Sequence, residues 1–81
     1  MVWHVYILKC ADGTLYTGST NNLERRVKEH NESAIGAKYT RTRRPVKLMF
    51  SSECADRSAA LKEEAHIKSL TRTQKLVLTE T

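Results

Sequence analysis

Short apolar runs separated by turn-forming residues divide the chain into strand-like and helix-like segments. The run Val2–Leu8 is rich in residues that favour strands. Asp12-Gly13 is a strong hairpin signal, and an extended pattern resumes over Leu15–Thr17. The pattern therefore predicts a β-hairpin over about Val2 to Thr17.

An amphipathic helix is predicted next, from about Leu23 to His30. Its spacing places Leu23, Val27 and His30 on one stripe and Arg26 beside it, so the arginine borders the core. The residues before it favour helix caps: Ser19, Thr20, Asn21 and Asn22. Contact with phosphate is the alternative role for Ser19, Thr20 and Asn22.

The second half predicts one strand and two helices. A loop over Ser33–Arg44 precedes Pro45, and Val46–Ser51 has the large apolar residues of a strand. Asp56 is a good cap for a helix over about Arg57–Leu70. Its core face is expected to hold Ala60, Leu61, Ile67 and Leu70, and Thr71 is expected to cap a final short helix.

These elements predict an α+β domain: a three-stranded antiparallel sheet, formed by the hairpin and the Val46 strand, flanked by helices. Glu63 and Glu64 both lie within or beside the apolar stripe of the long helix. An acidic residue there needs a reason. Periodicity does not choose between the two, and an ion pair with a basic neighbour is the plain alternative.

The composition indicates one domain over residues 1–81. With 40% hydrophobic and 28% charged residues the chain is typical of a soluble globular protein. No apolar run approaches the roughly 20 residues that span a bilayer, and the start lacks signal-peptide features. We therefore expect no membrane association and a cytoplasmic location. Cys10 and Cys54 are too few for a structural zinc site and are expected to be free thiols, a disulfide being the alternative.

Positive charge is concentrated in the middle of the chain. The net charge is +5, the pI is near 9.5, and no acidic residue occurs between Ser33 and Ser52. Five basic residues crowd around Tyr39: Lys38, Arg41, Arg43, Arg44 and Lys47. A solvated basic loop is one interpretation. Contact with a phosphate backbone is the other, and the hairpin chemistry favours it.

Several of these residues together resemble the GIY-YIG nuclease superfamily. Its two tripeptides correspond to His4-Val5-Tyr6 and Tyr16-Thr17-Gly18, the first differing at two of three positions. Arg26 follows Tyr16 by ten residues, where the family carries its arginine, and His30 follows one turn later. Glu64 aligns with the family's metal-binding glutamate, which makes the choice that periodicity left open.

The resemblance extends over nearly the whole chain. Gly36–Thr40 and Pro45–Leu48 are similar to the small, single-domain bacterial branch related to excision-repair and junction-cutting nucleases. It implies a metal-dependent DNA endonuclease in which Glu64 holds one Mg²⁺ or Mn²⁺ ion. Tyr6 would be the general base, with His30 assisting it; Tyr16 would position water or phosphate, and Arg26 would brace the phosphate.

Duplex or branched DNA is the expected partner, in repair or recombination, with the protein nucleoid-associated when working. The expected contacts are Gly18, Ser19, Lys38, Tyr39, Arg41, Arg43, Arg44 and Lys68. Lys68, one turn after Glu64, has simple pairing with that glutamate as its alternative. A homodimer or a protein partner is expected to supply specificity. A non-catalytic nucleic-acid-binding module with the same fold is the alternative function, and a protein-interaction domain is a third.

Overall fold

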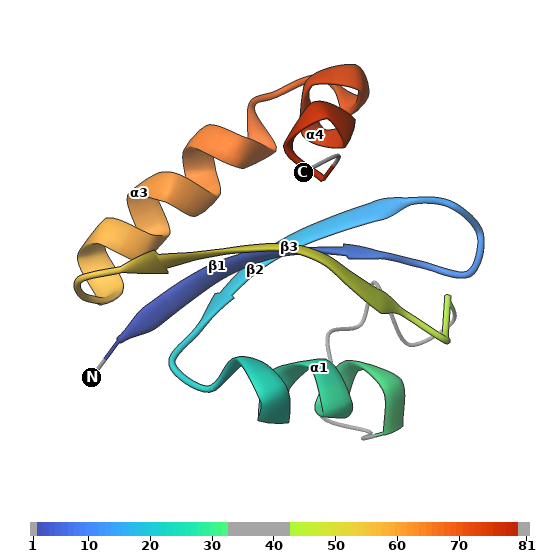
Figure 1. Cartoon of the computed structure of the whole chain (residues 1–81), viewed down its shortest axis with the longest axis horizontal. Coiled ribbons are helices and arrows are strands. Elements are labelled where there is room, and N and C mark those ends of the chain that lie inside the picture. The colour runs from blue at the N-terminus through green and yellow to red at the C-terminus, as the bar shows by residue number, and fades with distance from the viewer. Residues whose placement is uncertain (1, 33–42, 80–81) are drawn as a thin grey trace.

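Helices cover both faces of a single antiparallel sheet with strand order β2-β1-β3 (Figure 1). This computed structural model describes residues 2–32 and 43–79. α1 lies against one face, whereas α3 and α4 lie on the other (Figure 1). The predicted α+β class is confirmed. The elements are β1 (Trp3–Lys9), β2 (Leu15–Thr20), α1 (Leu23–Glu32), β3 (Lys47–Cys54), α3 (Arg57–Lys68) and α4 (Arg72–Leu78).

The β1–β2 hairpin turns at the predicted Asp12-Gly13 pair. Gly13 has a φ of +86°, in the left-handed region that glycine adopts without steric cost. The Asp12 carboxylate accepts hydrogen bonds from the backbone N–H of Thr14 at 3.0 Å and from its hydroxyl at 2.7 Å. Local turn chemistry therefore sets the hairpin register.

β2 continues three residues beyond its predicted end, and this corrects the interpretation of Ser19. Ser19 pairs with Val5 and Thr20 pairs with His4 in the β1–β2 ladder, so both belong to the strand. The cap of α1 is Asn22, whose side-chain oxygen accepts the backbone N–H of Arg25 at 3.1 Å. Ser19 is not a helix cap, because the sheet ladder extends past the glycine before the chain turns.

The caps of the later helices are confirmed. The Asp56 side chain accepts the backbone N–H of Ala59, and Thr71 forms a reciprocal capping box with Gln74. The predicted boundaries differ modestly: α1 is two residues longer, β3 continues to Cys54, and α3 ends at Lys68.

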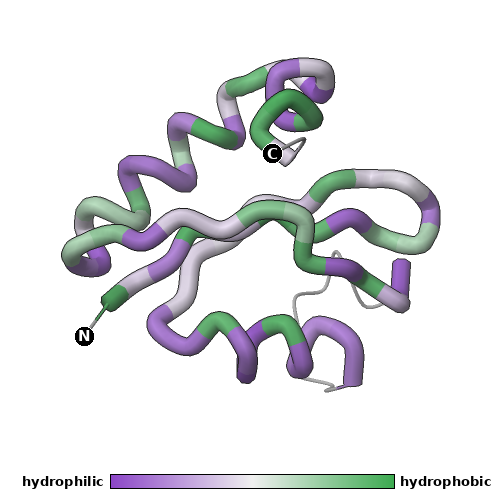
Figure 2. Tube along the Cα trace, in the orientation of Figure 1, coloured by the Kyte–Doolittle hydropathy of each residue, from purple (hydrophilic) through white to green (hydrophobic). Residues whose placement is uncertain are grey.

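β1 is buried on both faces. Val5 and Ile7 pack with Ala60 and Ile67 on the side of α3. Tyr6 and Leu8 belong to a second cluster on the side of α1, where Leu23 and Val27 pack against it. Hydrophilic positions predominate along α1, with short apolar intervals (Figure 2). Two-sided burial explains why β1 is an almost continuous apolar run.

The predicted core face of α3 is correct for Ala60 and Ile67 but wrong for Leu61. Leu61 is 47% exposed. Ala60 and Ile67 are seven residues apart and define the buried stripe, and Leu61 lies a further 100° around the helix from Ala60. The helix therefore packs through a narrower stripe than its apolar content suggests.

Both cysteines are free thiols, as predicted. Cys10 is buried in the cluster beside α1, whereas Cys54 packs against the cluster beside α3. Within residues 2–32 and 43–79, no helix is both long enough and apolar enough to cross a membrane.

Candidate active site

Three predicted catalytic side chains form an aromatic cluster on the face of the sheet that α1 covers. Tyr6 and Tyr16 come from adjacent strands, and α1 supplies the buried His30. The Tyr6 hydroxyl and His30 Nε2 are 2.9 Å apart. The Tyr16 and His30 ring centroids are 5.0 Å apart, and those of Tyr6 and Tyr16 are 6.4 Å apart. The structure therefore brings together residues separated by 24 positions in sequence.

Gly18 makes this cluster sterically feasible. It pairs directly with Tyr6 across the β1–β2 ladder. A Cβ atom at this position would lie 2.5 Å from the Tyr6 hydroxyl oxygen and 3.2 Å from a Tyr16 ring carbon. The close approach that Gly18 permits is therefore that of the Tyr6 ring. Its predicted contact with DNA is untested.

Burial keeps the Tyr6–His30 pair uncharged near neutral pH. Burial and the nearby Tyr16 raise the pKa of Tyr6 to about 12, although Arg26 acts in the opposite direction. Burial and the positive charges of Arg26 and Arg44 lower the pKa of His30 to about 4, against the opposing effect of Glu29. The pair is a neutral phenol hydrogen-bonded to a neutral imidazole, and the imidazole tautomer decides which group donates.

Arg26 lies beside this pair, as its helical position predicted. Burial lowers its pKa, but hydrogen bonds with Tyr6 and Glu29 outweigh burial and raise it. Arg26 Nη1 donates to Glu29 Oε1 at 3.2 Å. The guanidinium is therefore a permanent positive charge next to the Tyr6 hydroxyl.

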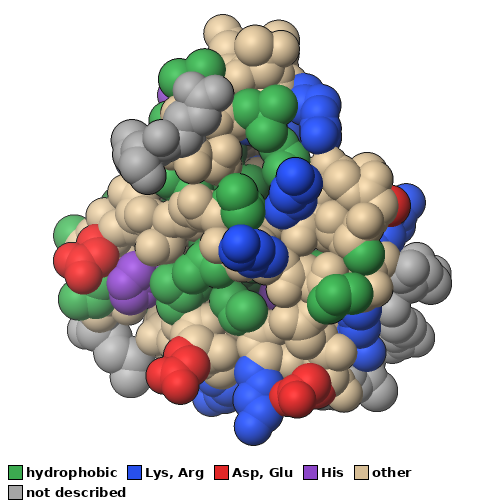
Figure 3. All heavy atoms as spheres, turned by 45° about the vertical axis from the view of Figure 1, so that its right-hand side comes forward, with side chains coloured by type: hydrophobic (Ala, Val, Ile, Leu, Met, Phe, Trp, Pro, Cys, Tyr) green, Lys and Arg blue, Asp and Glu red, His purple; other side chains and the backbone are tan. Residues whose placement is uncertain are grey.

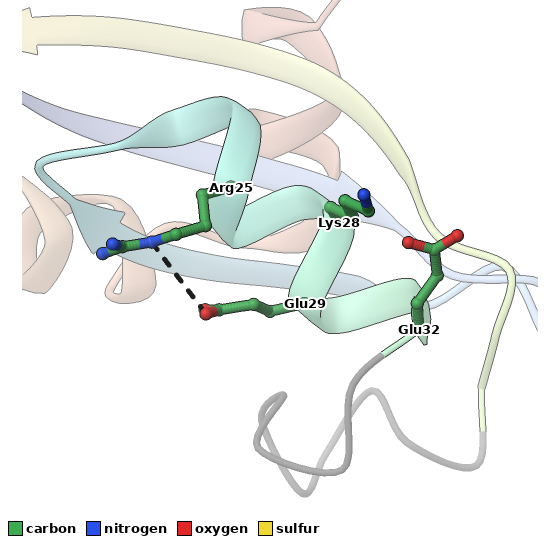
Figure 4. Close-up of a pocket in the computed structure, with 4 residues that line it drawn as sticks. All are labelled: Arg25, Lys28, Glu29 and Glu32. Atoms are coloured by element: carbon green, nitrogen blue, oxygen red, sulfur yellow. Dashed lines mark ion pairs between the residues drawn. The ribbon is translucent and has the colours of Figure 1, made fainter.

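Glu29 is a site neighbour that the sequence did not single out. On the outer side of α1 it lines a shallow charged pocket with Arg25, Lys28 and Glu32 (Figure 4). Its second carboxylate oxygen lies 3.9 Å from Arg25 Nε (Figure 4). Glu29 therefore joins Arg26 to the solvent-facing charges of α1. Its i, i+3 spacing from Arg26 was the signal available in sequence.

Glu64 belongs to a second cluster, on the α3 side of the sheet. Its carboxylate accepts a hydrogen bond from the Ser19 hydroxyl at 2.6 Å and pairs with Lys68 Nζ at 2.7 Å. Burial raises the pKa of Glu64, but the bonds to Lys68 and Ser19 outweigh burial and lower it. Glu64 is therefore an ionised carboxylate, and Lys68 forms the pair that was the alternative to its predicted DNA contact.

The two clusters lie on either side of β2, the edge strand of the sheet. Tyr16 and Gly18 face α1, whereas Ser19 faces α3, because side chains alternate along a strand. The clusters interact electrostatically: the charge of Glu64 raises the pKa of Tyr6, and Tyr16 raises that of Lys68. The predicted set Tyr6, Tyr16, Arg26, His30 and Glu64 is thus assembled around one strand edge.

The donor set near Glu64 fits a weakly held Mg²⁺ or Mn²⁺ ion. The part of the chain that the structure describes contains no group of three or more His, Cys, Asp or Glu side chains placed to hold a metal. A single carboxylate suits an ion that keeps several waters and uses substrate oxygens. Lys68 now occupies one Glu64 oxygen, so an ion bound there would compete with an ammonium group.

Two of the predicted DNA contacts have intramolecular partners. Arg43 Nε pairs with Asp12 Oδ2 at 3.0 Å. Arg44 donates from Nε to the His30 carbonyl oxygen and from Nη2 to that of Glu29, at 3.4 Å for the second bond. Arg44 therefore holds the end of α1 that carries His30. Lys38, Tyr39 and Arg41 lie outside the described residues.

Asn31 also links α1 to the segment that leads into β3. Its side chain accepts the backbone N–H of Val46 at 2.7 Å and donates to the Val46 carbonyl at 3.1 Å. The start of β3 is thereby fixed to α1. No sequence pattern pointed to Asn31 or to this role of Arg44, because both depend on a tertiary contact between distant segments.

Comparison with known proteins agrees with this geometry. The GIY-YIG catalytic domain matches residues 2–76. A UPF0213 protein of Desulfotalea psychrophila is 59% identical, covering 94% of this chain and 69% of that protein. A UPF0213 protein of Syntrophus aciditrophicus is 53% identical over 93% of this chain and 86% of its own length.

Two solved structures share the fold. The solution NMR structure of a UPF0213 protein from Bacillus halodurans has a TM-score of 0.60 and 42% identity, covering 96% of this chain and 82% of that one. A solution NMR structure from E. faecalis has a TM-score of 0.63 and 47% identity, covering 93% and 79%. The chain therefore belongs to the GIY-YIG family and is related to its UPF0213 proteins.

Proposed function

We propose that this protein is a metal-dependent endonuclease that hydrolyses phosphodiester bonds in DNA. The observation that carries this proposal is the assembly of Tyr6, His30 and Arg26 on one side of the β2 edge and Glu64 on the other. An edge strand leaves room for an extended polyanion to approach Tyr16, Arg26 and Glu64, which are partly exposed, whereas Tyr6 and His30 lie buried behind them. Membership in a family of nuclease domains supports the same reaction class.

Arg26 is proposed to brace the reacting phosphate. Its planar fork matches phosphate oxygens and remains charged throughout the reaction. Glu29 shares the guanidinium now, at 3.2 Å, and keeps it oriented along α1. Tyr16, which packs against His30, would hydrogen-bond the phosphate or position the attacking water.

Tyr6 is proposed to act as a relay to His30, because its pKa of about 12 makes it a protonated phenol at rest. In the tautomer where Nε2 is unprotonated, Tyr6 donates to His30 and its oxygen is left to accept a proton from water. The water proton then moves to Tyr6 as the Tyr6 proton moves to His30, which becomes a transient cation and, because its pKa is about 4, returns the proton to solvent after the ester bond breaks. The water oxygen forms the new P–O bond, the ester P–O bond breaks, and the departing oxygen takes a proton from solvent.

Glu64 is proposed to hold the divalent ion. When bound there, Mg²⁺ or Mn²⁺ would supply positive charge to neutralise the phosphate and to assist the departing oxygen. Ser19 would orient the carboxylate through its 2.6 Å hydrogen bond. Lys68 would exchange its 2.7 Å pairing with Glu64 for a phosphate oxygen of the substrate.

Nicked, branched or otherwise deformed DNA is the proposed substrate, in repair or recombination. The sequence shows no pattern of a recognition helix that would read bases in a major groove. Selectivity would come from DNA shape and from a second copy of the chain or a partner protein. Cytoplasmic location with association to the nucleoid follows from that substrate.

The second candidate is a nucleic-acid-binding module without catalysis. Two observations favour it: the pKa of Tyr6 is raised, and both Glu64 oxygens already have partners. This candidate predicts salt-sensitive DNA binding that ignores both Glu64 and divalent metal.

The test incubates the purified protein with supercoiled plasmid and with nicked, flapped and four-way DNA, in Mg²⁺, Mn²⁺ or chelator. Glu64→Gln is compared with Glu63→Gln, the matched control one residue away. We expect metal-dependent cutting that is lost in Glu64→Gln and kept in Glu63→Gln. DNA binding without cutting by the wild type in either metal would favour the binding module.

A further inference from the structure

A polar groove lies between the hairpin turn and α4, and none of the predicted catalytic residues lines it. It is lined by Thr14, Leu15, Arg72 and Lys75, with a volume of about 220 Å³. Since one water takes up ~30 Å³, the groove has room for a phosphate group with part of its hydration shell. Two of its four lining residues are cations, and none is acidic.

Arg72 and Lys75 are two cations on α4 whose charges have no acidic partner among the described residues. Among the described residues, neither side chain has a hydrogen bond or ion pair, in contrast to Arg43 and Lys68, which pair with carboxylates. The closest acidic residue along the hairpin is Asp12, and its carboxylate is already paired with Arg43 at 3.0 Å. Within residues 2–32 and 43–79, the positive charge of the groove is therefore not neutralised.

The groove follows directly from the candidate active site along the β2 edge. Leu15, which lines the groove, is adjacent in sequence to Tyr16. Tyr16 in turn lies near enough to Lys68 to raise its pKa. α4 begins four residues after Lys68, so its cations extend the same positive track. The space-filling view of the hairpin end shows Lys and Arg side chains near the centre of that face, with acidic side chains mostly toward its margins (Figure 3).

The spacing matches a nucleic-acid strand. Thr14 and Tyr16 are two residues apart, which is about 6.6 Å at ~3.3 Å per strand residue. Phosphates on one DNA strand recur about every 3.4 Å along the duplex axis. A duplex whose axis lies along β2 would thus place a phosphate of the same strand at the groove about two nucleotides from the reacting phosphate.

We propose that this groove is a second phosphate-binding site, in which Arg72 and Lys75 hold the DNA backbone about two nucleotides from the reacting phosphate. The proposal rests on the proposed function, because it takes the substrate to be DNA. It adds a direction: the bound strand runs from Glu64 and Tyr16 toward the hairpin turn. Anchoring the strand on both sides of β2 would orient the reacting phosphate over Arg26.

The experiment measures DNA affinity by fluorescence anisotropy against salt concentration, in chelator and in the Glu64→Gln background, so that no cutting intervenes. Arg72→Gln with Lys75→Gln is compared with Arg57→Gln plus Lys62→Gln. The control pair also removes one arginine and one lysine, from two exposed positions of α3 that are not among the predicted DNA contacts. Circular dichroism confirms that each variant folds.

We expect the Arg72/Lys75 variant to lower the slope of log affinity against log salt by about 1 to 2, because each phosphate that a cation neutralises adds ~0.9 to the slope. The control pair should change it by much less. Equal slopes for the two variants, or no DNA binding by the parent protein, would overturn the proposal. Equally strong competition by polyglutamate would overturn it too, by showing a surface that accepts any polyanion.

The outcome is separable from that of the proposed function. If the wild-type protein cuts DNA but the Arg72/Lys75 variant and the control pair have equal salt slopes, the second phosphate site is rejected and the endonuclease is kept. A slope change without metal-dependent cutting by the wild type would keep the groove as a DNA contact and remove the endonuclease.

Discussion

The two sides of β2 differ in the burial and in the charge of their polar side chains. On the α1 side, Tyr6 and His30 are buried and neutral, and their hydrogen bond links two uncharged groups at pH 7. On the α3 side, Glu64 and Lys68 are charged and closer to solvent, with the Lys68 side chain 54% exposed. The first arrangement is suited to moving a proton, and the second to exchanging cations. In the proposed function, each face supplies one half of phosphodiester hydrolysis.

The largest expected effect that sharpens this comparison comes from Arg26, the permanent charge on the neutral side. Arg26→Lys keeps the charge but loses the bidentate fork, and it also loses the geometry that meets both Tyr6 and Glu29. We expect cleavage to fall by about 10²-fold or more, as for loss of one preorganised donor. Arg25→Lys, on the exposed side of α1, is the matched control. A fully active lysine variant would show that Arg26 supplies only generic charge.

Gly18→Ala separates the two sides by disturbing only the aromatic one. The new methyl group would meet the Tyr6 hydroxyl at 2.5 Å, so the ring must move away from His30. Overpacking of this kind costs roughly 1–3 kcal/mol in the free energy of unfolding, measurable by chemical denaturation. Gly13→Ala is a useful contrast, because it is strained by its φ of +86° but meets no atom within 4 Å. Wild-type stability together with an unchanged Tyr6 environment in Gly18→Ala would contradict the described packing.

The smallest expected effect is the pH dependence of stability, which distinguishes the neutral pair from the charged one. His30 has a pKa of about 4 when folded and 6.5 when exposed, so the unfolded chain binds more protons between these values. Stability should therefore decrease as the pH falls from about 6.5 to about 4. Glu64, whose pKa is lowered, adds a decrease in the same direction below its ordinary 4.5.

At high pH the sign is opposite for Tyr6. Its pKa rises from 10.0 to about 12 on folding, so the unfolded chain loses its proton first and stability should decrease as the pH rises above 10. Denaturant unfolding from pH 4 to 11 would give a plateau between about 6.5 and 10. His30→Gln should reduce the loss of stability between about pH 6.5 and 4, the acidic limb of the profile, and leave the loss above pH 10 in place. An acidic limb unchanged by that substitution would place His30 in solvent rather than in the core.

Local sequence signals were sufficient for the elements and for much of the site. Asp12-Gly13, Asp56 and Thr71 act through bonds to residues two or three positions away, and all three were predicted correctly. The helical spacing of Leu23, Val27 and His30 likewise predicted which side chains α1 brings to the sheet. Glu64 was chosen over Glu63 by family resemblance, because helical periodicity places both near the apolar stripe.

Long-range pairing decided what the sequence did not reveal. Ser19 was taken for a helix cap because its residue type favours that role, but the ladder with Val5 turns it toward Glu64. Arg44 was grouped with a basic loop, but its guanidinium meets the last carbonyls of α1. Leu61 has core-like chemistry and lies outside the stripe defined by Ala60 and Ile67. Each outcome depends on which segments meet in space.

The most direct test of the central claim is single-turnover cleavage of a nicked or branched DNA duplex in Mg²⁺, with wild-type protein, Tyr6→Phe and Glu64→Gln side by side. Each substitution disables one side of β2, and DNA affinity in chelator serves as the control for folding and binding. The account predicts that both variants bind DNA with little loss and that each alone abolishes most of the cleavage. Cleavage that survives in either variant at the wild-type rate would contradict the claim that the two sides form one active site.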